Sequence, residues 1–310
     1  VTRKMVEYTR ASERGRSFSD VADEWWGDAY DRIAVTTSRG YRIAYQRAVD
    51  YFGDEPIRNI RTQDVNAYLV RIARMGLTAK SVMSHKSIMS MIFLRAIEDG
   101  EIDNNPVDFA RIPKSAAPSK KRPAASVMDE EAIRSAAEQN EIFPVPFIAL
   151  YTGMRLGEIL GLQRRDIDFR KEIITVQRSL FYTGGWNLKE PKTEAGKRKI
   201  PIFSPLTDFL LRYKDLPPRA FICSEDGGKN PYSTKRIRTL EKHYHENTNT
   251  TFSMHQLRHS YTTIAVRAGV PLDTLQEILG HANIQTTMDV YNEVREDALN
   301  EARNVLKAKK

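Results

Sequence analysis

Between residues 18 and 100 the large hydrophobic residues recur every three or four positions, which is the spacing of amphipathic helices. The pattern predicts four helices, over residues 18–26, 41–52, 62–76 and 78–100. Thr62 and Thr78 are candidate N-caps of the third and fourth helices, because a threonine hydroxyl can accept a backbone hydrogen bond there. We therefore expect a helical N-terminal domain over residues 18–110.

After residue 124 the pattern changes to short strands placed between helices. Three β-branched or aromatic runs predict a small antiparallel sheet, over residues 173–176, 179–181 and 198–202. Helical spacing predicts further helices over residues 130–137, 147–151, 205–213, 233–244, 254–268, 273–279 and 284–290. The predicted fold class is therefore mainly α with a small antiparallel β-sheet, and the second domain would be α+β.

Polar and basic segments suggest where these domains begin and end. Residues 1–17 hold few large apolar groups, which predicts an extended arm or the remnant of a preceding segment. Residues 111–123 contain three prolines and five basic residues, which predicts an exposed linker, although a basic loop within one domain has the same composition. The second domain would then cover residues 124–294. Residues 295–310 form a tail with alanine and leucine on one face.

Composition narrows the class of protein further. A length of 310 residues is enough for two cores, and the net charge of +8 suits a polyanionic partner, although a basic protein without such a partner has the same charge. The single cysteine, Cys223, excludes an intrachain disulfide and a cysteine-based metal cluster. No apolar run approaches the ~20 residues of a membrane span, and the N-terminus lacks the apolar core of a signal peptide, so we expect a cytoplasmic protein.

The most informative residues are one tyrosine, two arginines and two histidines in the second half of the chain. They are Arg155, His255, Arg258, His281 and Tyr291. A tyrosine hydroxyl can act as a nucleophile, guanidinium groups match the oxygens of a phosphate, and histidines can carry protons at neutral pH. Together these side chains could attack a phosphodiester without a metal ion.

The sequences around these residues resemble the tyrosine recombinases of the lambda integrase type. The matching segments are TGMRLGE at 152–158, HQLR at 255–258 and LGHANIQTTMDVY at 279–291. The resemblance is specific from about residue 129 to residue 291, whereas the four predicted N-terminal helices match only in general pattern. It implies a helical, SAM-like core-binding domain followed by an α+β tyrosine recombinase catalytic domain.

The resemblance also implies a role for each residue of the set. Tyr291 would be the nucleophile that forms a 3′-phosphotyrosyl bond, and Arg155 and Arg258 would hold the non-bridging phosphate oxygens. His255 and His281 would serve in proton transfer and hydrogen bonding. Glu158 would support Arg155 from behind, although a surface salt bridge between residues three apart on a helix would place them in the same way.

A general acid is also needed, because the leaving 5′ oxygen must be protonated. Lys192 is the candidate, since it lies in PKTEAGKRKIP (191–201), which resembles the family's loop between two strands. Lys197 and Lys199 compete for this role on composition alone. Gly196 departs from the pattern, because many relatives have serine there.

A zinc site is the alternative explanation for the histidines. His255 and His259 are four residues apart, as in the HExxH motif, but Gln256 replaces the glutamate and Arg258 would place a positive charge beside the cation. Gln256 also stands where the family often has aspartate. We expect no metal and no cofactor, and a structural role for His259.

The expected function is site-specific DNA recombination through a Holliday junction, integrating or excising a mobile element. The expected partners are double-stranded DNA with core sites, a homotetramer on two duplexes, and accessory bending and excision proteins. The basic linker residues are candidate DNA contacts: Lys114, Lys120, Lys121 and Arg122. The tail would pack on a neighbouring protomer or in cis, and an arm-binding domain would precede Val1.

Two other functions fit the same residues. A type IB topoisomerase shares the chemistry but relaxes supercoils as a monomer, and a non-catalytic regulator could use the same scaffold for DNA binding alone. If the protein is instead a site-specific recombinase, as expected, we expect a prokaryotic or phage origin and association with the nucleoid.

Overall fold

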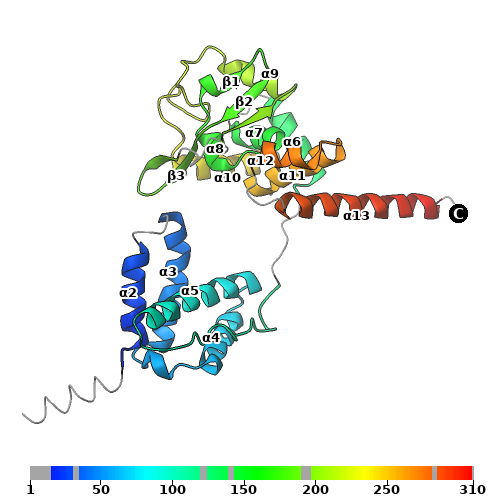
Figure 1. Ribbon diagram of the computed structural model, residues 1–310. Coiled ribbons are helices and arrows are strands. Elements are labelled where there is room, and N and C mark those ends of the chain that lie inside the picture. The colour runs from blue at the N-terminus through cyan, green and yellow to red at the C-terminus, as the bar shows by residue number, and fades with distance from the viewer. Residues whose placement is uncertain are drawn as a thin grey trace, which may run out of the picture. The chain divides into compact units, whose positions relative to one another are not determined.

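The computed structural model describes residues 15–30, 35–118, 124–138, 143–189, 197–280 and 285–308. The chain divides into two compact units between residues 121 and 122 (Figure 1). Each unit has its own hydrophobic core. Helices predominate in both units, and the strands are short and antiparallel. The predicted fold class, mainly α with a small antiparallel β component, is confirmed.

Within its described residues, the first unit is a cluster of four helices, joined in part by a short 3₁₀ turn at Ile57–Asn59. The helices are α2 (Phe18–Tyr30), α3 (Val35–Phe52), α4 (Thr62–Arg74) and α5 (Ala79–Glu98). Their apolar stripes meet in one core, where the Phe18 ring lies 5.0 Å from that of Phe52 and 5.8 Å from that of Phe93. All four helices predicted from hydrophobic spacing are present.

The two predicted threonine caps have different outcomes. The Thr78 side chain accepts a hydrogen bond from the Ser81 backbone at 3.3 Å and caps α5. The prediction for Thr62 was wrong, because Thr62 is the first residue inside α4 and Arg61 precedes the helix. The Thr62 hydroxyl instead donates to the Pro106 carbonyl oxygen at 2.9 Å.

The first part of the predicted linker belongs to the first unit. Ala117 donates a backbone hydrogen bond to Leu77 at 3.1 Å and accepts one from Ala79 at 2.9 Å. Ile112 and Ala116 pack against the core of this unit. These contacts attach residues 112–117 to the first unit, and the division between the two units falls within the predicted linker of residues 111–123. Residues 119–123 lie outside the described residues.

The predicted N-terminal arm is also anchored where the structure describes it. Arg16 forms ion pairs with Glu24 at 2.7 Å and Asp99 at 2.9 Å, and its backbone carbonyl accepts from Ile57 at 3.0 Å. Arg16 is thus attached to the first unit, and the extended arm or remnant of a preceding segment over residues 1–17 stays a prediction. Residues 1–14 lie outside the described residues.

The described part of the second unit contains two small antiparallel sheets instead of the one predicted. The first has the order β1 (Ile167–Asp168), β2 (Ile173–Val176), β5 (Arg198–Pro201), and the second pairs β3 (Ser179–Tyr182) with β4 (Trp186–Lys189). The strands β1 and β4 were not predicted, since β1 has two residues and β4 contains no β-branched residue. In the register of β2 with β5, Ile174 lies opposite Ile200, and both are buried.

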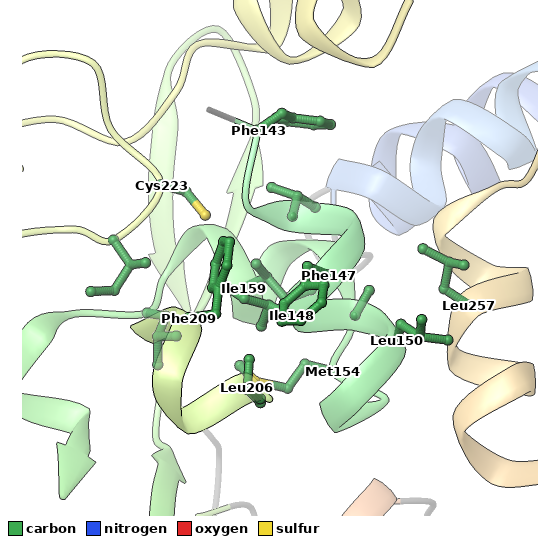
Figure 2. Close-up of a cluster of buried hydrophobic side chains, with 14 of the residues drawn as sticks. Phe143, Phe147, Ile148, Leu150, Met154, Ile159, Leu206, Phe209, Cys223 and Leu257 are labelled. Atoms are coloured by element: carbon green, nitrogen blue, oxygen red, sulfur yellow. The ribbon is translucent and has the colours of Figure 1, made fainter. Parts of the chain in front are cut away.

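Eight helices of the second unit lie within the described ranges. They are α6 (Val127–Glu138), α7 (Val145–Thr152), α8 (Leu156–Leu160), α9 (Leu206–Leu210), α10 (Thr234–Thr248), α11 (Met254–Arg267), α12 (Leu272–Leu279) and α13 (Gln285–Ala308). Figure 2 shows Phe147, Ile148 and Leu150 of α7 among buried side chains from α9 and α11. Helix α7 is therefore the centre of this core.

Two glycines between α7 and β3 lie too close to neighbouring atoms for a larger residue to replace them. Gly153 ends α7 with a φ of 62°, and a Cβ atom there would lie 2.6 Å from the Tyr261 ring. A Cβ atom on Gly157 in α8 would lie 2.5 Å from the Leu180 carbonyl oxygen. Only glycine fits both places, so the start of α8 is held close to the core and to β3.

Helix α13 runs without interruption from Gln285 to Ala308. The sequence predicted a helix that ends at Val290 and a separate tail from residue 295. This division was wrong, because the segment contains no proline or glycine to end a helix, and apolar residues continue at helical spacing. No helix within the described ranges has the length and apolar character needed to cross a membrane.

Candidate active site

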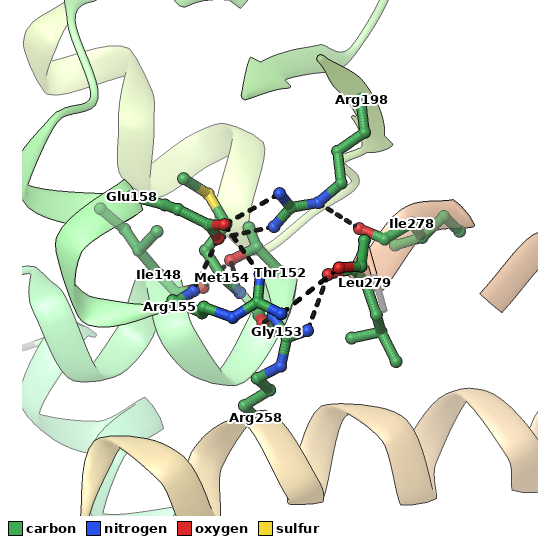
Figure 3. Close-up of polar contacts among 11 residues, drawn as sticks. Ile148, Thr152, Gly153, Met154, Arg155, Glu158, Arg198, Arg258, Ile278 and Leu279 are labelled. Atoms are coloured by element: carbon green, nitrogen blue, oxygen red, sulfur yellow. Dashed lines mark hydrogen bonds and ion pairs between the residues drawn. The ribbon is translucent and has the colours of Figure 1, made fainter. Parts of the chain in front are cut away.

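Arg155 and Glu158 are joined at the first turn of α8. Glu158 accepts a hydrogen bond from the Arg155 backbone at 2.8 Å and from its Nη1 atom at 3.1 Å. The predicted pairing is therefore present, but Glu158 is buried, whereas half of the Arg155 side chain is exposed. Arg155 can present its guanidinium to a ligand while Glu158 holds it from inside (Figure 3).

Arg258 extends from α11 towards Arg155 and Glu158. Its side chain is buried, and it donates from Nη1 to the Gly153 carbonyl at 2.6 Å and from Nη2 to the Leu279 carbonyl at 2.7 Å. These bonds join the end of α7 to the end of α12 (Figure 3). A guanidinium has two N–H groups on each Nη atom, so one donor on each remains for a further acceptor.

Three consecutive carbonyl groups at the end of α12 each accept a hydrogen bond from a different arginine. Arg198 donates to Ile278 at 2.7 Å, Arg258 to Leu279 at 2.7 Å, and Arg155 to Gly280 at 3.3 Å. The last carbonyls of a helix lack partners within the helix and carry partial negative charge, so cations are favoured there. The end of α12 thus gathers three guanidinium groups just before His281.

Arg198 is a member of this group that the sequence did not predict. It lies on β5, and its Nη1 and Nη2 atoms bind the two Glu158 carboxylate oxygens at 3.0 and 2.6 Å. A sequence signal did exist: side chains alternate along a strand, so Arg198 shares a face with the buried Ile200. An arginine on a buried face needs a carboxylate partner.

The cluster of three arginines and Glu158 has more positive than negative charge. Burial raises the pKa of Glu158, but the hydrogen bonds and charge of Arg198, together with Arg155, outweigh it and hold that pKa below its ordinary value. Burial lowers the pKa of Arg258 to about 9, and the neighbouring arginines add to the decrease. Arg258 therefore stays charged at neutral pH, and three guanidinium groups gather around one carboxylate, which suits the group to bind a phosphate.

Replacing Glu158 with glutamine should flatten the loss of stability in acid. Because the folded-state pKa of Glu158 is depressed, its stabilisation is complete above the ordinary value of 4.5 and is lost as the pH falls through the folded pKa. Glutamine cannot titrate, and the variant should also lose about 3–5 kcal/mol at neutral pH because two arginines lose a buried partner.

Urea unfolding between about pH 3 and pH 7 would test this. The matched control is Glu131→Gln, at an exposed position on α6, which should keep the wild-type pH dependence. Parallel stability curves for wild type and Glu158→Gln would contradict the assignment of the acid dependence to Glu158.

The two histidines of the zinc alternative lie on α11 and differ in surroundings. His255 is exposed on the first turn, one turn before Arg258. His259 lies 3.8 Å from the Glu293 carboxylate of α13, in keeping with a structural role. Within the described ranges no three histidine, cysteine or acidic residues gather as metal ligands.

Tyr291 lies on α13, which packs against α11 and α12. The residue is partly exposed, and the Arg295 guanidinium lies 5.9 Å from the centre of its ring. Val290 and Val294 on either side are buried, so this part of the helix is fixed. Among the residues the structure describes, no hydrogen bond joins Tyr291 to Arg155 or Arg258, and its approach to them stays a prediction.

Several predicted site residues fall outside the described ranges. They are Lys192, His281, Lys120, Lys121 and Arg122. Lys114 is described and exposed, in a turn of the first unit. Of the competitors for the acid role, Lys197 and Lys199 are both exposed on either side of the buried Arg198.

Residues 128–297 match the model of the phage integrase family. A XerC-like tyrosine recombinase of Caldanaerobacter subterraneus is 25% identical over 76% of this chain and 68% of its own. The ICEBs1 integrase of Bacillus subtilis is 28% identical over 78% of this chain and 69% of its own, and the tyrosine recombinase XerA of Pyrococcus furiosus is 30% identical over 66% of each. The chain spans about two thirds of the length of these relatives.

Two solved structures show similar folds. The Tn1549 transposon integrase in complex with a circular intermediate DNA has a TM-score of 0.75 and 22% identity, over 93% of this chain and all of that chain. A lambda integrase tetramer bound to a Holliday junction has a TM-score of 0.68 and 20% identity, over 89% of this chain and 77% of that chain. Both likenesses extend over the two units described above.

Proposed function

Because this chain belongs to the phage integrase family of tyrosine recombinases, we propose that it cuts and rejoins DNA strands at specific sites to integrate or excise a mobile element. The observation that carries the proposal is the convergence of Arg155 and Arg258 on neighbouring carbonyls at the end of α12. Glu158 and the buried ends of two helices support these arginines, so their guanidinium groups are fixed before any ligand arrives.

The proposed reaction begins with the Tyr291 oxygen. As this oxygen loses its proton, with His255 or His281 as the proposed acceptor, it forms a bond to phosphorus and the bond from phosphorus to the 5′ oxygen breaks. Lys192 is the proposed donor of the proton that the leaving oxygen takes. The products are a 3′-phosphotyrosyl ester and a free 5′ hydroxyl group.

The two arginines would stabilise this step through the non-bridging oxygens of the phosphate. The negative charge on these non-bridging oxygens changes as the attacking and leaving oxygens share the phosphorus. Hydrogen-bond donors that are already in place, in a site of low polarity, stabilise such a change of charge most effectively. The ester keeps the energy of the broken bond, so attack by a 5′ hydroxyl of a second duplex rejoins the strands without ATP.

A duplex with specific core sites is the proposed partner. The two units would share the duplex, and Lys114 with the basic residues at 120–122 would contact its phosphates. The Tn1549 integrase structure is a DNA complex and the lambda integrase structure is a tetramer bound to a Holliday junction, which supports a tetramer on two duplexes here. Accessory bending and excision factors, and action at the nucleoid, belong to the same proposal.

Strand exchange between two labelled duplexes would test the function. The binding site is first recovered from random duplexes with the Tyr291→Phe variant, and a nicked duplex with this site is then mixed with wild-type protein and a second duplex. We expect a covalent protein–DNA adduct and labelled strands joined to the second duplex. Relaxation of supercoiled DNA without exchange would indicate a topoisomerase, and binding without an adduct would indicate a regulator.

A further inference from the structure

We propose that Arg198 is a positioning residue of the recombination reaction. It ties Glu158 to the end of α12 and so fixes where Arg155 and Arg258 present their guanidinium groups. This inference rests on the proposed function and adds a residue to its site. It comes from three bonds of one buried side chain, two to a carboxylate and one to a carbonyl.

Arg198 itself is not placed to contact DNA. Only 6% of its side chain is exposed, and its Nε, Nη1 and Nη2 atoms all have acceptors within 3.0 Å. Half of the Arg155 side chain, by contrast, is exposed. Arg198 therefore acts on the phosphate only through the groups that it holds.

Glu158 is shared between the two arginines. Its Oε1 atom accepts from Arg155 Nη1 at 3.1 Å and from Arg198 Nη1 at 3.0 Å, and its Oε2 atom accepts from the Arg155 backbone at 2.8 Å and from Arg198 Nη2 at 2.6 Å. Without Arg198, the carboxylate would have Arg155 as its only strong partner. The Arg155 guanidinium would then move towards the buried Glu158 carboxylate and away from the exposed position in which it would bind a phosphate.

The end of α12 is the second group that Arg198 holds. The Ile278 carbonyl would lose its donor without Arg198, next to the Leu279 and Gly280 carbonyls that bind Arg258 and Arg155. The fit is close, because a Cβ atom on Gly280 would lie 3.1 Å from Arg198 Cδ. Movement of Arg198 would therefore shift the carbonyls that orient both phosphate-binding arginines.

The test compares Arg198→Ala, Arg198→Lys and the control Arg170→Ala, whose side chain is exposed in the turn between β1 and β2. Two quantities are measured with the site-bearing duplex: the dissociation constant, and the rate of adduct formation at saturating DNA. Both are repeated with a duplex in which a neutral methylphosphonate replaces the scissile phosphate. This substrate depends less on arginine charge, because one negative oxygen is gone.

We expect Arg198→Ala to slow adduct formation by about 100-fold, as a displacement of about 1 Å in a reacting group does, with the dissociation constant within about twofold of wild type. Arg198→Lys keeps the charge but has one donor nitrogen in place of three, so it should slow adduct formation by about 10-fold. Both losses should shrink on the methylphosphonate substrate, and Arg170→Ala should resemble wild type. If the alanine variant unfolds, the phosphate and methylphosphonate duplexes are compared with the lysine variant alone.

Three results would overturn the proposal. A dissociation constant that rises as far as the rate falls would mean that Arg198 contacts DNA. The same loss on both substrates would mean that the change only lowers the fraction of folded protein. Wild-type rates in both Arg198 variants would mean that the residue has no part in the reaction. Failure of the wild-type chain to form an adduct would instead overturn the proposed function, and this inference with it.

Discussion

Replacing Tyr291 with phenylalanine should abolish covalent attachment to DNA and leave DNA binding intact. The substitution removes only the hydroxyl group that would attack phosphorus. The ring contact with Arg295 and the buried Val290 and Val294 remain, so α13 should keep its place. The measurement is a denaturant-resistant adduct on a nicked duplex, beside a gel-shift titration of the same duplex.

The matched control for this variant is Tyr182→Phe, at an exposed tyrosine on β3. It should form the adduct at the wild-type rate, since its hydroxyl has no proposed role. If Tyr291→Phe still became attached to DNA through a tyrosine, the nucleophile would be a different residue, and the assignment of α13 to the active site would be wrong.

The second large effect should come from Arg258→Lys. One ammonium group cannot span the Gly153 and Leu279 carbonyls and also reach a phosphate, whereas the planar guanidinium can. Loss of such a fixed donor should slow adduct formation by about 10²–10³-fold. A carbonyl left without its donor should also lower the free energy of unfolding by about 1–3 kcal/mol.

The rate should be measured at saturating DNA and compared with the unfolding midpoint in urea. Arg267→Lys serves as the control, because Arg267 is exposed at the other end of α11. An Arg258→Lys variant that is destabilised but forms the adduct at the wild-type rate would show that Arg258 supports the fold and does not hold the phosphate.

Much of the fold could be predicted from the sequence because its helices are amphipathic. The stripes of α2 to α5 and of α11 each face one core, so local spacing contains the information. The strands β1 and β4 could not be predicted, since pairing with a partner strand stabilises such short strands more than their own residues do. Residues 111–117 are ordered for the same reason, through bonds to Leu77 and Ala79.

The site shows a similar division. Arg155, Glu158 and Arg258 were predicted from their local sequences, and the structure brings these three together. Arg198 was missed because its partners are distant in sequence: Glu158 is 40 residues away and Ile278 is 80. A sequence does not show which carbonyl groups are left without donors when a helix ends, so it does not show which arginines will bind them.

Helix α13 has a mechanical consequence. Its first half is clamped by Val290 and Val294, whereas Leu299, Val305 and Leu306 are exposed on its second half. At a rise of 1.5 Å per residue, about 25 Å of straight helix extends from Tyr291 to the end of the helix at Ala308. No proline or glycine interrupts the helix between Tyr291 and Ala308. A sideways force on its outer end would therefore be transmitted along the helix to the turns held by Val290 and Val294, where Tyr291 lies.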